Sequence, residues 1–171
     1  MDAAALLRQQ YAQAHHWLDI TLGEIDTDQM HWCNAEGAMP AAAHYAHIVT
    51  GEDAILNMVI RKSQPLMASS WAGKTGLSEP PPWGDWSEWA RTVRIDLPQF
   101  KEYAQAVFAE TDAYLASLTG ADLDQEIDTA PLPFGITPIG VMASTLCGNC
   151  FMHVGEISAV KGLQGLQGYP F

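Results

Sequence analysis

The order of apolar and polar positions along the chain predicts four long helices. In four segments, apolar side chains recur at intervals of three and four residues, which places them on one face of a helix. The segments are residues 2–25, 40–62, 96–118 and 137–161. No stretch shows the convincing alternation that is typical of a half-buried strand. The pattern therefore predicts an all-α fold, specifically a four-helix bundle in which each helix buries one face.

Residues with strong preferences for helix ends support these boundaries. Asp2 and Asp96 stand where a side chain can accept a hydrogen bond from a free backbone amide in the first turn of a helix. Thr137 is a candidate cap for the last helix, and Pro138 fits its first helical position, where no backbone donor is needed. Gly162 is suited to the left-handed turn that ends many helices.

The connection between the second and third predicted helices differs in composition from the rest of the chain. Residues 63–96 contain the run Pro80–Pro82, several glycines and four of the six tryptophans, so no long element is expected there. We expect this long connection to cross over between the second and third helices. A segment of this kind either covers the core or closes over a site as a lid. A cover is the simpler interpretation, and a lid is kept as the alternative.

Length and composition indicate one globular domain, residues 1–171. The chain is 48% hydrophobic, and it has no apolar run of the ~18 residues that a membrane span needs. Eight Lys and Arg against twenty Asp and Glu give a net charge of -12, which disfavours nucleic acid as a partner. Three cysteines argue against a disulfide framework, and the N-terminus has no signal-peptide pattern. We therefore expect a cytoplasmic protein with neither nucleic-acid nor membrane partners.

Histidines occupy apolar stripes of two predicted helices. His44 and His47 lie on the stripe of the second helix, and Asn149 and His153 lie one turn apart on that of the fourth. Buried polar groups need partners, because an unpaired one costs a few kcal/mol. One interpretation is a metal site in the core, since facing helices place imidazole ligands accurately. The other is a set of core histidines satisfied by hydrogen bonds to one another or to neighbours such as Glu52.

Two other patterns in the sequence contain residues capable of chemistry. Cys147 and Cys150 form a C-x-x-C pair, but it falls in the middle of a predicted helix with no strand before it. Packing is the first interpretation, metal ligation the second, and redox catalysis is disfavoured. Glu52 and Glu156 are candidate general bases, although we expect both helices to carry their acids on outer faces.

Two segments resemble a known family. AHIVTGEDAIL in the second predicted helix and HVGEISAVKGLQG at the end of the fourth are similar to the DinB-like (DinB/YfiT) superfamily of metalloenzymes. The resemblance implies a four-helix bundle, often dimeric, with a long crossover. It also implies a divalent metal, best zinc or nickel, held by one histidine of the second helix and two of the fourth, four residues apart. His47 and His153 match two of these ligands.

The third family position falls on Asn149, which is not histidine. An amide oxygen is a weaker ligand for zinc or nickel than imidazole, so His44 or water completes the site, or the metal has been lost. Related members are transferases and isomerases that use low-molecular-weight thiols, which a metal can present as thiolates. The resemblance thus implies a metal-dependent enzyme, a homodimer acting on a small molecule. The alternative is a non-catalytic dimer that binds a small ligand and keeps a degenerate site.

Overall fold

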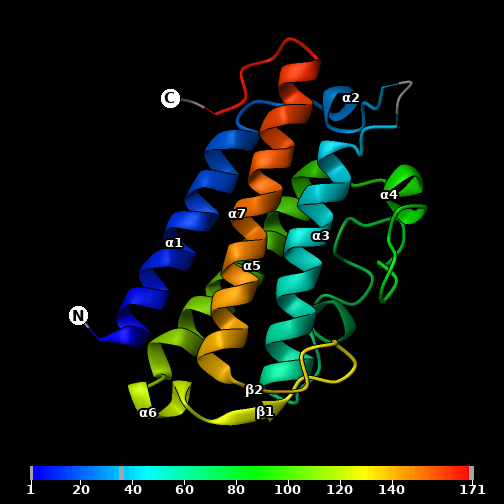
Figure 1. The fold of residues 1–171 in the computed structure, drawn as a ribbon. Coiled ribbons are helices and arrows are strands. Elements are labelled where there is room, and N and C mark those ends of the chain that lie inside the picture. The colour runs from blue at the N-terminus through cyan, green and yellow to red at the C-terminus, as the bar shows by residue number, and fades with distance from the viewer. Residues whose placement is uncertain (1, 35–36, 170–171) are drawn as a thin grey trace.

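Four long helices run alongside one another in the structure, a computed structural model that describes residues 2–34 and 37–169 (Figure 1). They are α1 (Ala3–Leu22), α3 (Ala41–Ala54), α5 (Leu97–Ser117) and α7 (Ile139–Leu163). α7 packs against both α1 and α3, and α5 packs against α1 and α3 from the other side. The all-α class expected from the sequence is confirmed. None of the helices in the described ranges combines the length and the apolar character needed to cross a bilayer.

The remaining elements are short. The helical ones are α2 (Thr27–Met30), the π-helix η1 (Ile55–Ile60), the 3₁₀-helix η2 (Leu66–Ala68), α4 (Trp89–Thr92) and α6 (Gly120–Leu123). Two strands, β1 (Glu126–Asp128) and β2 (Ile136–Pro138), pair antiparallel with Ile127 opposite Thr137. The sequence did not predict this hairpin, because strands of three residues are too short to show an alternating pattern.

Helix starts follow the predicted caps in two cases and differ in a third. The Asp2 carboxylate accepts from the Ala5 amide at 2.8 Å, and the Asp96 carboxylate caps α5. Thr137 does not cap α7. It belongs to β2, so the helix begins after Pro138, whose position has no side-chain cap. The backbone of Thr137 is extended to pair with β1, and this moves the predicted helix start by one residue, from Pro138 to Ile139.

α3 is buried on nearly every side, unlike the one-faced helix predicted. Ala42 and Ala46 are fully buried, and so are polar residues such as Asp53. α5, α7 and the connection after η1 all pack around it. The α-helical period of residues 40–62 places Met58 on the same stripe as His44 and His47, but Met58 is 42% exposed. A π-helix has more residues per turn than an α-helix, so side chains in η1 leave the face that the α-helical period predicts.

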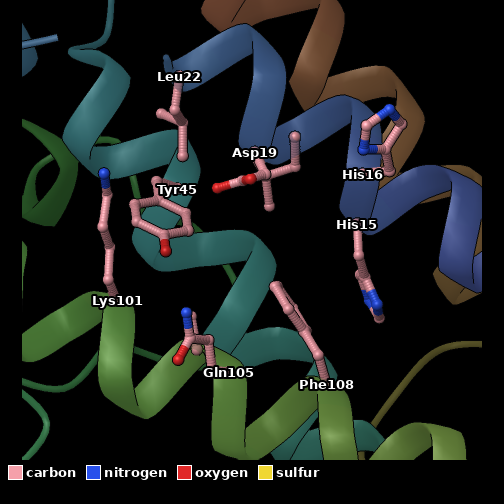
Figure 2. A pocket seen from close by; sticks show the side chains of 10 residues that line it. His15, His16, Asp19, Leu22, Tyr45, Lys101, Gln105 and Phe108 are labelled. Atoms are coloured by element: carbon pink, nitrogen blue, oxygen red, sulfur yellow. The ribbon is translucent and has the colours of Figure 1, made fainter. Parts of the chain in front are cut away.

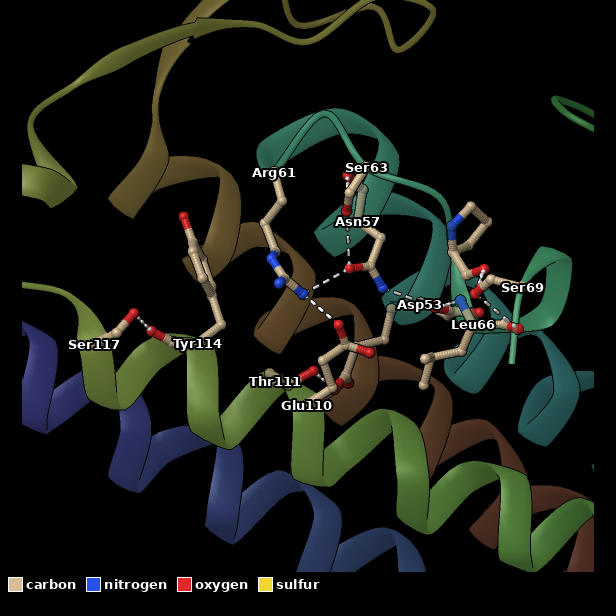
Figure 3. Close-up of polar contacts among 12 residues, drawn as sticks. Asp53, Asn57, Arg61, Ser63, Leu66, Ser69, Glu110, Thr111, Tyr114 and Ser117 are labelled. Atoms are coloured by element: carbon tan, nitrogen blue, oxygen red, sulfur yellow. Dashed lines mark hydrogen bonds and ion pairs between the residues drawn. The ribbon is translucent and has the colours of Figure 1, made fainter. Parts of the chain in front are cut away.

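A buried carboxylate fixes the start of the long connection after η1 (Figure 3). Asp53 accepts from the backbone amides of Leu66 and Met67 at 2.7 and 2.9 Å. It also accepts from the Tyr103 hydroxyl at 2.7 Å and from the Asn57 amide at 2.9 Å. Charge-assisted hydrogen bonds of this kind are the strong ones. Asp53 therefore ties α3 to α5 and sets the direction in which the connection leaves.

Candidate metal centre

Two histidines and a glutamate converge where α3 meets α7. The Nδ1 atoms of His44 and His153 are 3.3 Å apart. A carboxylate oxygen of Glu156 lies 3.1 Å from His44 Nδ1 and also contacts His153 Nδ1. The ligand atoms of all three residues lie within 4.8 Å of one another. Among the described residues, no other group of three His, Cys, Asp or Glu meets this criterion.

The helices place these side chains by simple periodicity. His153 and Glu156 are three residues apart on α7, so they lie on one face. His44 lies in the first turn of α3, where that helix packs against α7. His44 is only 5% exposed, whereas the Glu156 side chain is 53% exposed. The cluster therefore has a buried end on α3 and an open end at the carboxylate.

Burial keeps the α3 imidazoles neutral. It lowers the pKa of His44 to about 4, which Glu156 partly offsets and which the neighbouring His153 reinforces. The pKa of His47 is lowered to about 4 as well, first by burial and then by His153 and His44. Neutral imidazole is the form that binds a metal, so at pH 7 no proton has to be removed from either ring.

Trp86, from the long connection, packs over the histidines. Its ring stacks on His47, with centroids 4.3 Å apart and planes 10° from parallel. It also meets His44 and His153 edge to face, at 5.7 and 5.8 Å. The connection therefore covers these imidazoles, and its Trp89 is buried in the core, as the cover interpretation of residues 63–96 expects.

A cavity of about 400 Å³ opens beside His47. α3 and η1 form one wall, and the run Pro80–Pro82 with Trp83 forms the opposite one. Ile55, Met58, Met67 and Leu132 also line it, so the lining is mainly apolar. His47 and Thr50 are polar residues at its boundary. An apolar cavity with a few polar groups beside a cluster of potential ligands is the usual form of a small-molecule site.

The donor set, and the spacing of its two imidazoles, fit a divalent cation. Two imidazoles and one carboxylate are a known ligand set for zinc, with a further position left open. Zn–N bonds of about 2.0–2.1 Å at tetrahedral angles bring two nitrogens to about 3.4 Å from each other. The observed Nδ1–Nδ1 distance of 3.3 Å agrees with that value.

The structure brings two of the four predicted ligands together and leaves the other two outside the closest group. His44 and His153 meet directly, as described. His47 is adjacent, with its ring centroid 4.8 Å from that of His153, but it stacks on Trp86 and lies outside the closest donor group. Asn149 is half-buried one turn before His153, and no hydrogen bond or ion pair in the described ranges includes its side chain.

Glu156 is the residue that sequence reasoning undervalued. It was expected on an outer face, and its side chain is indeed half-exposed, but its carboxylate turns back to the histidines. The i, i+3 spacing from His153 was the available signal. The expectation for Glu52 was wrong. Glu52 is 1% exposed, because it is paired with His15 at 2.9 Å and with the Thr111 hydroxyl at 2.6 Å inside the helix packing.

Comparisons with known proteins identify the family of the chain and support its fold. The sequence profile of the DinB superfamily matches residues 6–157, which confirms the resemblance noted in the two segments. Among solved structures, the conserved protein of locus from Enterococcus faecalis superposes with a TM-score of 0.74. That match has 22% identity and covers 95% of this chain and 97% of the other, so it shows a shared fold. No curated protein sequence matches the chain.

Proposed function

The chain belongs to the DinB superfamily, and on that premise we propose that it is a metal-dependent enzyme acting on a small molecule. The observation that carries the proposal is the convergence of His44, His153 and Glu156, whose ligand atoms lie within 4.8 Å of one another. We propose these three as the ligands of a divalent cation, with zinc or nickel fitting the donor set best. His47 and Asn149 border the same centre from the family's ligand positions.

Each neighbouring residue has a role that its chemistry suggests. A divalent cation held there supplies the Lewis acidity that lowers the pKa of a thiol or water beside it. His47 is neutral and lines the cavity, so it can exchange a hydrogen bond or a proton with a bound substrate. Trp86 holds the His47 ring by stacking and shields the centre from bulk water.

The shape of the cavity favours an apolar substrate. Its proline, methionine and aromatic lining offers few hydrogen-bond partners, and His47 marks the end nearest the cluster. This geometry agrees with a transferase that joins a low-molecular-weight thiol to a small apolar electrophile. It also agrees with an isomerase that uses such a thiol to convert a small apolar electrophile. We propose that class of reaction, with the electrophile in the cavity.

Metal analysis of protein purified without a histidine tag tests the centre. We expect about one zinc or nickel per chain, or uptake of one after incubation. Glu156→Gln and His44→Gln should each weaken binding at least about tenfold, since each removes one of three ligands. Glu102→Gln removes an exposed carboxylate from α5 and is the matched control. A stoichiometry near zero that incubation does not change would refute the metal.

Consumption of a small thiol such as glutathione in the presence of an apolar electrophile tests the activity. Turnover should require the metal and fall in His47→Gln, which removes an imidazole from the cavity but none of the three proposed ligands. Equal rates with and without metal would rule out a metal-dependent reaction.

A non-catalytic small-ligand binder is the second candidate. It is favoured by Asn149 at a family histidine position and by the exposure of Glu156, both of which weaken a metal site. Asn149→His separates the two. A large gain in metal affinity would show that the native site is degenerate, whereas unchanged tight binding would show that the native ligands suffice.

We further propose a cytoplasmic homodimer in which residues 1–171 form one four-helix-bundle domain. Val141 and Met152 are exposed on α7 and, being three turns apart, lie on one face. Gly148 between them leaves open space at its missing Cβ, so a second helix can approach closely. Light scattering tests this: Val141→Glu with Met152→Glu should convert a dimer to a monomer, and a wild-type monomer would overturn the dimer.

A further inference from the structure

A second cavity lies between α1, α3 and α5, among residues separate from those of the metal centre (Figure 2). Its volume is about 270 Å³, and none of its lining residues belongs to the His44, His153 and Glu156 cluster or to the apolar cavity beside His47. Liquid water occupies about 30 Å³ per molecule, so the space suits a ligand of roughly nine non-hydrogen atoms. Its lining includes charged and polar side chains that can bind a small ligand.

The hydroxyl of Tyr45 lines this cavity. Tyr45 is only 4% exposed and packs edge to face on Phe100, with ring centroids 4.8 Å apart. Within residues 2–34 and 37–169, no protein group forms a hydrogen bond with its hydroxyl, and the hydroxyl is not among the fully buried polar atoms. It is therefore open to the cavity and can bind a ligand there. A tyrosine hydroxyl is both a donor and an acceptor, so it can donate a hydrogen bond to a ligand.

Side chains of opposite charge border the same cavity. Figure 2 shows Asp19 from α1 and Lys101 from α5 on either side of Tyr45, with Gln105, also from α5, below the Tyr45 ring. In the described part of the chain, no ion pair or hydrogen bond engages the side chains of Asp19, Lys101 or Gln105. One carboxylate and one ammonium group are therefore both free to bind a ligand.

Apolar groups line the remainder. Leu18, Leu22 and Ala104 contribute to the wall, together with the ring of Phe108. Phe108 is held in place by stacking on His15, with centroids 3.7 Å apart, and His15 is fixed in turn by the buried Glu52. The cavity thus combines a rigid apolar wall with an acid, a base and a hydroxyl donor.

We propose that this cavity binds a small zwitterion of the α-amino acid class with an apolar side chain. The ammonium group of the ligand pairs with Asp19, and its carboxylate pairs with Lys101 and accepts a hydrogen bond from the Tyr45 hydroxyl. The apolar side chain packs against Leu18, Leu22 and Phe108. Because the site contributes one positive and one negative charge, a ligand with one of each leaves no charge unpaired.

The zwitterion site and the metal centre share no residues, although α3 contributes to both. Tyr45 follows His44 directly, and adjacent residues of an α-helix point about 100° apart. From a single turn, Tyr45 therefore lines the second cavity, whereas His44 belongs to the metal centre. No residue that the metal proposal uses is needed for the zwitterion site.

Titration of metal-free full-length protein with L-leucine, followed by calorimetry or by NMR amide shifts, tests the proposal. We expect saturable binding with a Kd of about 1 mM or tighter. 3-Methylbutylamine and 4-methylpentanoate, which each keep the apolar chain but carry a single charge, should bind at least about tenfold more weakly. Equal binding by either one, or no binding of leucine at 10 mM (about tenfold above the expected Kd), would overturn the zwitterion class.

Variants locate the ligand. Asp19→Asn and Lys101→Met should each weaken leucine binding about tenfold or more, and Tyr45→Phe, which keeps the ring, should weaken it severalfold. Glu24→Gln is the charge-matched control on an exposed position and should bind like wild type. Glu156→Gln should bind leucine normally, so this test can succeed or fail independently of the metal centre. Wild-type affinity in both Asp19→Asn and Lys101→Met would place the ligand elsewhere and refute the site.

Discussion

Cys147 and Cys150 show how burial decides the role of a cysteine pair. Both face the core on α7, and neither is in a disulfide. Burial, with a smaller contribution from Glu52, raises the pKa of Cys147 to about 11 and raises that of Cys150 further. Since the thiolate is the nucleophile and the metal ligand, both thiols are poorly suited to redox or ligand chemistry at neutral pH. Packing, the first interpretation from the sequence, agrees with this.

We therefore predict that iodoacetamide at pH 8 modifies the exposed Cys33 and leaves Cys147 unmodified in the folded protein. A thiol with a pKa near 11 is ~0.1% thiolate at pH 8, against about a quarter for an unperturbed thiol, so the rate should be at least 100-fold lower. The thiolate fraction of Cys147 rises about tenfold per pH unit up to that pKa, so labelling should rise towards pH 10. Peptide mass spectrometry measures this, with urea-unfolded protein as the control; rapid labelling of Cys147 at pH 8 would contradict it.

Asp53 is the buried carboxylate whose removal should be most costly. It is fully buried, and its four donors would lose their acceptor together. We predict that Asp53→Ala lowers the free energy of unfolding by about 3 kcal/mol, because buried donors left without a partner cost about 1–3 kcal/mol each before the structure relaxes. Urea denaturation measures the loss.

Asp112→Ala is the matched control for that experiment. Asp112 forms a two-bond pair with Arg8 at 2.6 and 2.8 Å, but both side chains are about half exposed. Exposed pairs contribute about 0–1 kcal/mol. Similar losses in the two variants would mean that burial and donor count do not set the contribution of Asp53.

At the scale of elements, the end of α1 is closed by a residue from α7. The last carbonyls of a helix lack intrahelical donors. Lys161, only 8% exposed, donates from Nζ to the carbonyl oxygens of Thr21 and Leu22. Burial lowers the pKa of Lys161, yet the ammonium still lies at the negative end of the α1 dipole, where a cation is stabilised.

Lys161→Met, which keeps the side-chain volume but no donor, should cost about 1–2 kcal/mol. For a chain of this size that corresponds to a Tm lower by roughly 2–8 °C. Amide hydrogen exchange should quicken in the last turn of α1 in particular. Lys74→Met changes an exposed lysine and should leave both measurements unchanged. An equal effect in the two variants would argue against a capping role.

Element prediction from the sequence succeeded where a pattern is long and local. The apolar spacing found all four long helices, and the caps Asp2 and Asp96 are where they were expected. It failed where pairing or packing overrides local preference. Thr137 joins a strand instead of capping α7, and the π-helical turn moves Met58 to the surface. Neither effect has a periodic signature in the residues concerned.

At the scale of the whole molecule, the candidate site could be predicted only in part, because packing between distant segments leaves no local pattern in the sequence. His44 and His153 were found because each lies on a long apolar stripe. Glu156 was not, since an acid on a half-exposed helix face gives no sign that it turns inwards. The place of Trp86 follows from the path of the connection through space, which no local pattern encodes. Contacts between segments far apart in the sequence could thus be identified only from the structure.

Because of those same contacts, a cation bound at the candidate metal centre would cross-link distant parts of the chain. His44 and His153 are 109 residues apart in sequence, on helices that meet only in the folded state. A cation that binds both therefore favours the folded chain over the unfolded one. At a free concentration one hundred times its Kd, this adds about 2.7 kcal/mol to the free energy of unfolding.

We predict that zinc or nickel at that concentration raises the Tm of the metal-free protein by roughly 5–11 °C, as measured by scanning calorimetry. The rise should be largely lost in His44→Gln and reduced in Glu156→Gln, and it should persist in Glu102→Gln. A rise of the same size in all three variants would mean that the cation binds elsewhere. The order of the Tm increases among the three variants is a stronger test than the size of any one increase. Because His44 is buried on α3 and Glu156 is half-exposed on α7 beside His153, only loss of His44 cuts the link between the two helices.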